Sequence, residues 1–134
     1  MPAATQPHSR LCAYFSAREA EWDVVASVKR KVRVSSVRSR TPGVCAVLGH
    51  ARGEEVLTHP PFLCVEISGK NDGLVHLFER LDDFRGMGVE NIWVINPHLR
   101  RGYRYTTEGL MVAKDGVMRT SNPAISVPLD AIFE

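Results

Sequence analysis

The sequence has no apolar run that approaches the roughly 18 to 20 consecutive residues required for a membrane-spanning helix. Its first residues, Met1 to Pro7, also lack the basic stretch followed by an apolar stretch that is typical of a secretory signal. We therefore expect no membrane association and a location in the cytoplasm.

Cysteine is scarce, and the cysteines present are not grouped. Cys12, Cys45 and Cys64 lie far apart among apolar neighbours, and no CxxC spacing occurs. An odd number of cysteines without such spacing disfavours both a disulfide framework and a zinc site. The pattern predicts reduced thiols packed in the core.

Acidic residues are missing from one long interval, between Asp23 and Glu54, although the net charge of the chain is only +2. Basic residues gather in this interval, and six of them are candidates for binding nucleic acid: Lys29, Arg30, Lys31, Arg33, Arg38 and Arg40. A strip of this kind could contact the phosphates of DNA. It could equally be the solvated face of a half-buried strand, because Lys31 and Arg33 alternate with Val32 and Val34. The sequence favours neither interpretation.

The 134 residues, of which 44% are hydrophobic and 24% charged, have the composition of one compact domain spanning 1–134. Helical periodicity occurs over residues 8–22, with Ser9 as a candidate cap, and over 74–84, with Asp72 before it and Gly86 and Gly88 after it. Short β-branched or apolar runs predict strands at 24–28, 31–37, 44–48, 62–67, 91–95, 103–105 and 110–112. Lys114 to Val117 predicts a hairpin turn, and 125–129 an edge strand. Helices mixed with strands indicate an α/β fold.

Aromatic residues near the end of the chain have two interpretations. Tyr103 and Tyr105, with Arg100, Arg101 and Arg104, could stack on a nucleic acid strand and clamp it. Alternating aromatics on a hairpin more often pack against neighbouring elements, so packing is the favoured interpretation. Trp93 lies in a continuous apolar strand and is predicted to be in the core.

One carboxylate interrupts an apolar strand, because Glu66 follows Phe62 to Val65 directly. A buried carboxylate must be paired, protonated or bound to a cation, since unpaired burial costs several kcal/mol. Glu66 is therefore a candidate site residue. The alternative is a purely structural salt bridge to a neighbouring arginine.

The stretches around Glu66 resemble the PD-(D/E)xK nuclease superfamily and, within it, the Uma-type restriction endonucleases. The matching residues run in order along most of the chain: Arg33-Val34-Ser35, Arg40 to Cys45, Pro60 to Ile67, Glu79 to Phe84, Met87-Gly88-Val89, Trp93 to Pro97 and Val127-Pro128-Leu129. The resemblance implies a restriction-endonuclease-like core, a mixed central sheet flanked by helices, with a C-terminal β-hairpin. It also implies hydrolysis of DNA phosphodiesters with Mg²⁺ or Mn²⁺.

Two positions depart from the catalytic pattern that this resemblance implies. The family's Pro-Asp dipeptide supplies a metal-binding carboxylate, but Gly43 stands at the aspartate position; Glu66 matches the second carboxylate. The family's helical lysine is matched by Arg80, which cannot deprotonate a water. Lys70, four residues beyond Glu66, is a possible substitute, although Gly69 and Asn71 favour a loop there.

The remaining metal ligands that the resemblance implies are Glu66, the main-chain carbonyl of Ile67 and Asp72. Relatives also carry an N-terminal hairpin with a further acidic residue before the residues matched by His8-Ser9, and this sequence lacks it. So few carboxylates predict weak or lost metal binding and little turnover. Three hypotheses follow: an impaired DNA endonuclease, a non-catalytic nucleic-acid-binding module, or a decayed reading frame. Relatives are often dimeric, which makes a homodimer possible.

Overall fold

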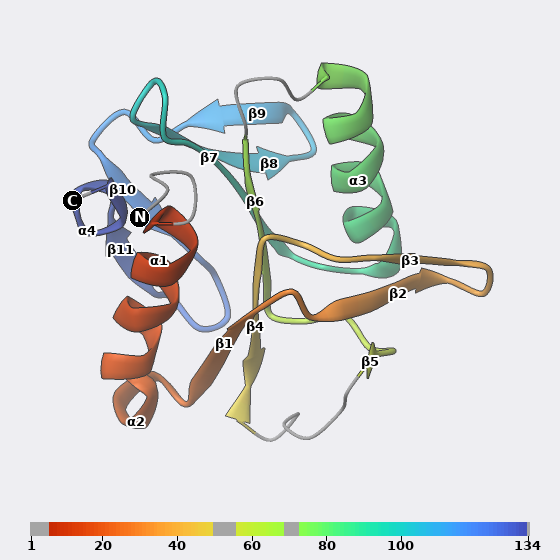
Figure 1. Cartoon of the computed structure of the whole chain (residues 1–134), viewed down its shortest axis with the longest axis horizontal. Coiled ribbons are helices and arrows are strands. Elements are labelled where there is room, and N and C mark those ends of the chain that lie inside the picture. Colours follow the sequence, from red (N-terminus) through yellow and green to blue (C-terminus); the bar gives the residue numbers. More distant parts are fainter. Residues whose placement is uncertain (1–5, 50–55, 69–72, 134) are drawn as a thin grey trace.

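The computed structural model describes residues 6–49, 56–68 and 73–133 (Figure 1). The helices are α1 (Gln6–Ala17), α2 (Glu19–Trp22), α3 (Leu74–Met87) and α4 (Leu129–Phe133). The strands are β1 (Val24–Val28), β2 (Lys31–Ser35), β3 (Arg38–Arg40), β4 (Val44–Leu48), β5 (Val56–Leu57), β6 (Leu63–Ile67), β7 (Asn91–Asn96), β8 (Arg101–Thr106), β9 (Gly109–Val112), β10 (Val117–Arg119) and β11 (Ser126–Pro128).

The central element is a mixed six-stranded sheet with the order β1-β4-β6-β7-β8-β9. Only β6 and β7 pair in parallel, and α3 is the crossover between them. The other neighbours in this sheet are antiparallel. Parallel strands require a long crossover, so the helical period that begins at Leu74 is what allows β6 and β7 to lie side by side.

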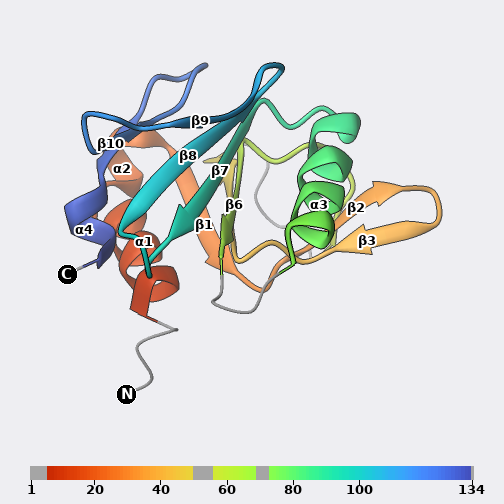
Figure 2. The same cartoon turned by 90° about the horizontal axis from the view of Figure 1, so that it is seen from above.

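Two apolar layers cover the two faces of the sheet (Figures 1 and 2). On one face, α1, α4 and the β10–β11 pair enclose a core that includes Leu11, Phe15 and Trp93. On the other face, α3 and the small β3-β2-β5 sheet enclose a second core that includes Leu81 and Phe84. Successive side chains of β6 point alternately into these two cores: Leu63 and Val65 belong to the first core and Cys64 to the second.

Most predicted elements are confirmed within one to three residues, and the differences are local. The first helix is interrupted at Arg18 into α1 and α2, and Ser9 lies inside α1 instead of capping it. Strand β2 ends at Ser35 because the chain turns there into β3, which the sequence did not predict. The predicted helix at 74–84 extends to Met87 and passes through Gly86, with Gly88 as its left-handed C-cap.

The turn predicted at Asp115-Gly116 exists, but it does not join a hairpin. Strand β9 pairs with β8, whereas β10 pairs with β11 in a separate two-stranded sheet. The C-terminal hairpin is therefore β10–β11, and residues 125–129 form its second strand and the start of α4. Local turn chemistry predicted the turn correctly, but the partner of each strand is set by long-range packing.

The predictions for the buried residues are confirmed where the structure describes them. Trp93 is fully buried, and its Nε1 donates to the carbonyl oxygen of Arg119 at 3.1 Å. All three cysteines are free thiols, and burial raises the pKa of each thiol. In the described part of the chain, no helix is long and apolar enough to cross a membrane.

Two glycines give a test of this packing, since the same substitution should have opposite effects. Gly102 in β8 is buried, and a methyl group there would overlap Met118 Sδ and lie 2.8 Å from Leu129 Cδ2. Gly86 is exposed in α3, with nothing within 4 Å of an added Cβ. We expect Gly102→Ala to lower the free energy of unfolding by about 1–3 kcal/mol. Gly86→Ala should raise it by about 0.5–1 kcal/mol.

Urea denaturation followed by circular dichroism measures both changes. Shifts of the two midpoints in the same direction would contradict the packing of β8 against β10 and α4.

Candidate functional site

Glu66 lies near the end of β6 and is 6% exposed. The alternation of the strand directs its side chain toward the face covered by α3, where Arg80 donates from Nε to Glu66 Oε1 at 3.0 Å. Arg80 follows the buried Leu77 by three residues, so its stem runs along the inward face of the helix. The structure thus brings Glu66 and Arg80 together as the sequence predicted, in the form of a salt bridge.

The Glu66–Arg80 pair is sheltered on the carboxylate side, since the side chain of Glu66 is 8% exposed and that of Arg80 is 25% exposed. In such surroundings, removing either partner is costly, because the remaining charge is left desolvated. A guanidinium cannot act as a base, because it does not release its proton. Arg80 therefore neutralises Glu66 and can stabilise negative charge, but it cannot activate a water.

Gly43 lies immediately before β4, beside the strand that carries Glu66. The ladder between β4 and β6 ends with Val44 opposite Val65, and Gly43, the residue before Val44, forms a bend. A Cβ at residue 43 would meet His8 Nε2 at 3.0 Å and the carbonyl oxygen of Val65 at 3.3 Å. Position 43 is therefore close to the Glu66 strand, as expected. A side chain there would nevertheless start against the imidazole of His8.

The carbonyl of Ile67, predicted as a metal ligand, faces this same side of β6. The N–H of Ser68 donates to Ile95 of β7 at 2.8 Å, so by alternation the peptide groups of Val65 and Ile67 face β4. Because the β4 ladder stops at Val44, the Ile67 carbonyl points past the first residue of that strand. It lies on the Gly43 side of the site.

An open cavity of about 390 Å³ adjoins position 43. Its lining combines the first turn of α1, the β1–β2 turn and the approach to β4: His8, Ser9, Val28, Lys29, Thr41, Pro42 and Gly43. Lys29 adopts a left-handed backbone conformation with φ of 57°, which is uncommon for a residue other than glycine. His8 and Lys29 thus border the space next to residue 43.

No role at this site was predicted for His8 from the sequence. The signal was present only in the resemblance, which matched His8-Ser9 to a segment of the family. Lys70 and Asp72, the other predicted site residues, lie outside the described residues.

The described residues do not fit a resident Mg²⁺ or Mn²⁺. Such ions require several oxygen ligands, with at least one or two carboxylates. Here the carboxylate of Glu66 is bonded to a guanidinium, and residue 43 has no side chain to contribute. Over residues 6–49, 56–68 and 73–133, no group of three or more His, Cys, Asp or Glu side chains is arranged to hold a metal.

The six basic candidates divide into two groups. Arg38 and Arg40 bind Asp83 of α3, at 3.3 Å and 2.8 Å, and so hold β3 to the helix. Partial desolvation acts to raise the pKa of the Asp83 carboxyl, but the hydrogen bonds from Arg40 and Arg38 outweigh it, so the pKa is lowered. The other group lies along the β1–β2 turn and β2, where Lys29, Lys31 and Arg33 are exposed and Arg30 is half-buried.

The aromatic residues of β8 pack, as favoured from the sequence. Tyr105 lies 5.9 Å from Phe78 of α3, measured between ring centroids, and its hydroxyl donates to Asp82. Tyr103 packs against the core beneath α3. The tyrosines are thus engaged with α3 and do not form a stacking platform.

The buried pair makes a prediction that a double-mutant cycle can test. Arg80→Met should lower the free energy of unfolding by about 3 kcal/mol, because it leaves Glu66 desolvated without the guanidinium. Adding Glu66→Gln to that variant should restore most of the loss, since no charge is then buried. The matched control is Arg38→Met, whose side chain is 54% exposed in its pair with Asp83. We expect a loss of less than about 1 kcal/mol there. Equal losses in Arg80→Met and the double variant would contradict the coupling.

Comparison with known protein families and with curated proteins finds no match for this chain. Among solved structures, the chain is similar to a crystal structure from Anabaena variabilis described as "a putative nuclease belonging to DUF820". The TM-score is 0.79 at 12% sequence identity, and the alignment covers 99% of this chain and 81% of the other. At this identity the similarity shows the fold alone: the chain has a mixed α/β fold with a restriction-endonuclease-like core.

Proposed function

We propose that this chain is a DNA-binding domain of the endonuclease type in which metal-dependent phosphodiester hydrolysis is impaired. The fold, shared with a protein described as a nuclease, supports the class. One observation supports the impairment: Arg80 Nε donates a hydrogen bond to the carboxylate of Glu66 at 3.0 Å, and Gly43 stands where the resemblance places the other metal-binding carboxylate.

Weak or lost metal affinity follows from charge as well as from ligand number. A divalent cation next to Glu66 would have to compete with a guanidinium 3.0 Å from the same carboxylate. Without a carboxylate at residue 43, few oxygen ligands compensate for dehydration of the ion. We therefore expect Mg²⁺ or Mn²⁺ to bind weakly in the absence of substrate phosphates, which would otherwise complete the coordination.

The surface that supports DNA binding is the β2–β3 hairpin, which projects beyond α3 (Figures 1 and 2). Lys31 and Arg33 are exposed along β2, and Arg38 is exposed on β3 while it also binds Asp83. A two-stranded ribbon fits the major groove of B-form DNA. Because Asp83 fixes β3 against the helix, the ribbon would be held in place before DNA binds.

The second candidate function is a nucleic-acid-binding module with no catalysis. The observation that favours it is again the neutralised Glu66, because a binding module needs the fold and the basic ribbon but no reactive carboxylate. The two candidates differ only in whether hydrolysis can be restored.

Nicking of supercoiled plasmid in Mn²⁺ tests the endonuclease assignment. The native chain should nick little or not at all. Gly43→Asp should introduce nicking, and Gly43→Asp with His8→Ala should nick faster, because His8 Nε2 lies 3.0 Å from a Cβ at residue 43. Gly43→Asn, which has the same size without the charge, is the matched control, and Glu66→Gln added to the active variant should abolish nicking.

The outcomes separate the candidates. Fast, Glu66-dependent nicking by the native chain would contradict the impairment. If no variant nicks but the chain binds DNA, the non-catalytic module is the correct assignment. If no variant nicks and DNA is not bound, the proposed function is withdrawn.

The DNA-binding surface can be tested separately by the salt dependence of binding. Lys31→Gln with Arg33→Gln should weaken duplex binding and reduce the slope of log K against log salt by about 1.8, for two lost phosphate contacts. Fluorescence anisotropy with a labelled duplex measures this slope. Arg100→Gln with Arg101→Gln removes the same charge elsewhere and should leave the slope nearly unchanged. Equal effects of the two double variants would show that the hairpin is not the contact surface.

A further inference from the structure

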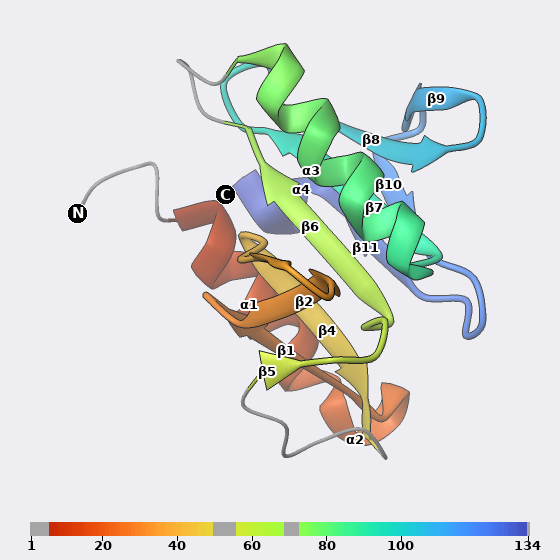
Figure 3. The same cartoon turned by 90° about the vertical axis from the view of Figure 1, so that its right-hand side faces the viewer.

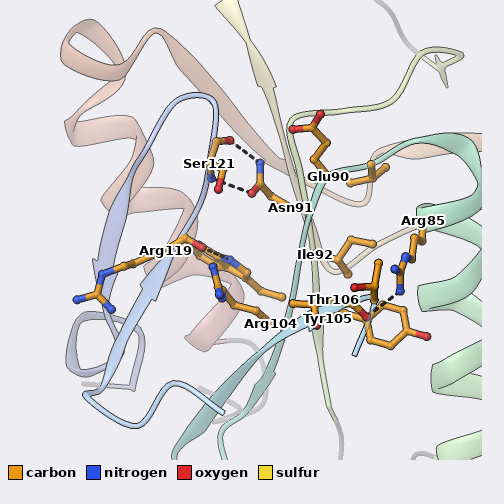
Figure 4. A pocket seen from close by; sticks show the side chains of 12 residues that line it. Arg85, Glu90, Asn91, Ile92, Arg104, Tyr105, Thr106, Arg119 and Ser121 are labelled. Atoms are coloured by element: carbon orange, nitrogen blue, oxygen red, sulfur yellow. Dashed lines mark hydrogen bonds between the residues drawn. The ribbon is translucent and has the colours of Figure 1, made fainter. Parts of the chain in front are cut away.

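A second polar cavity lies where β7 begins and β8 ends, and it has no part in the Glu66 site (Figure 4). Its volume is about 390 Å³, and the lining includes three arginines from three elements: Arg85 of α3, Arg104 of β8 and Arg119 of β10. A neighbouring cavity of about 330 Å³ shares Arg104 and Arg119 as its wall and adds Lys114. Arg104 and Arg119 thus border both cavities, which are here together called the arginine groove.

The arginine groove has a net positive charge, because basic side chains outnumber the carboxylates Glu90 and Asp115 in its lining. Among the residues that the structure describes, no carboxylate lies within salt-bridge distance of Arg85 or Arg104. Arg85 donates from Nη1 to the carbonyl oxygen of Thr106 at 2.7 Å, which positions the guanidinium without neutralising it. Arg119 pairs with Asp115 at 2.8 Å, but both side chains are more than half exposed, and such a pair exchanges readily for another anion. Glu90 is the one carboxylate in the lining of the larger cavity.

The floor of the groove is fixed by hydrogen bonds between β7 and the segment that follows β10 (Figure 4). Trp93 Nε1 donates to the carbonyl oxygen of Arg119 at 3.1 Å. Asn91 donates from Nδ2 to Ser121 O at 3.0 Å and accepts from Ser121 N at 2.9 Å. Because these bonds hold the main chain of β10 against β7, the attachment points of Arg104 and Arg119 are set before any ligand arrives.

We propose that the arginine groove binds consecutive phosphate groups of a single nucleic acid strand. Planar guanidinium groups match phosphate oxygens with two parallel hydrogen bonds, and lysine adds a point charge. Two cavities that meet at a shared arginine wall suit neighbouring phosphates of one chain, with Arg104 and Arg119 between them. The inference rests on the proposed function only in taking the strand to be DNA.

Arg104 is the residue to change, because it is exposed and its side chain forms no ion pair with a carboxylate among the described residues. Its substitution should therefore leave the fold intact, as the melting temperature will report. Arg101 lies on the same strand, is equally exposed and does not line the groove, so Arg101→Gln is the matched control.

The probe is a fluorescein-labelled single-stranded 12-mer of DNA, with binding followed by anisotropy over a range of salt concentrations. Arg104→Gln should weaken binding roughly tenfold and reduce the salt slope by about 0.7, for one lost phosphate contact. Arg101→Gln should change neither. Pyrophosphate, added in competition, should displace the strand from the native chain more effectively than from Arg104→Gln.

Equal affinities for Arg104→Gln and Arg101→Gln would overturn the inference. It would also be overturned if pyrophosphate binding depends on Arg104 while strand binding does not, since the groove would then be a small-anion site. The proposed function stands or falls on other results, namely plasmid nicking and the salt slope of the hairpin variant. If Arg104→Gln loses binding of the single-stranded DNA while its binding of duplex DNA is unchanged, the result supports the arginine groove as a separate binding site.

Discussion

The ion pair between Glu66 and Arg80 is the interaction on which the rest of the site depends. It joins the end of β6 to the middle of the crossover helix α3, and it places a buried charge at the end of an apolar strand. A buried carboxylate needs a compensating cation, and in this chain the cation is a side chain. The pair explains why a carboxylate persists in an apolar strand without requiring a metal.

Around that pair, the described residues offer few ligands for a divalent ion. Residue 43 has no side chain, and the imidazole of His8 occupies the space toward which one would extend. The central sheet, seen face-on in Figure 3, nevertheless keeps β4 beside β6, and His8 at the start of α1 lies against Gly43. The basic β2–β3 ribbon is held to α3 through Asp83. These features are the basis of the proposal that the chain is a DNA-binding domain of the endonuclease type with impaired hydrolysis.

Periodicity predicted most of the fold because the apolar positions follow regular spacing. The helix at Leu74 and the runs at Val44, Leu63 and Asn91 all became the elements that their patterns indicated. The pairing partners of the strands could not be predicted in this way. Asp115-Gly116 forms a turn as predicted, but β9 and β10 belong to different sheets. Strand β10 pairs with β11, and Trp93 donates a hydrogen bond to its last residue, Arg119. Pairing of this kind depends on contacts distant in sequence, which local propensity does not contain.

At the site, the sequence identified Glu66 as anomalous and left a salt bridge as its alternative, and Arg80 proved to be the partner. His8 could not be found in this way, because its proximity to residue 43 arises from the packing of α1 and not from any ligand spacing. The arginine groove was equally hidden, since Arg85, Arg104 and Arg119 come from a helix and two strands of different sheets. The sequence had grouped Arg104 only with Tyr103 and Tyr105, in the interpretation of these residues as a clamp.

The central claim is that Arg80, and not a divalent ion, neutralises Glu66. Titration of the native chain with Mn²⁺, followed by electron paramagnetic resonance alongside Glu66→Gln, tests it most directly. We predict the same weak, nonspecific uptake of Mn²⁺ by both proteins. A single saturable site in the native chain that is absent from Glu66→Gln would contradict the account.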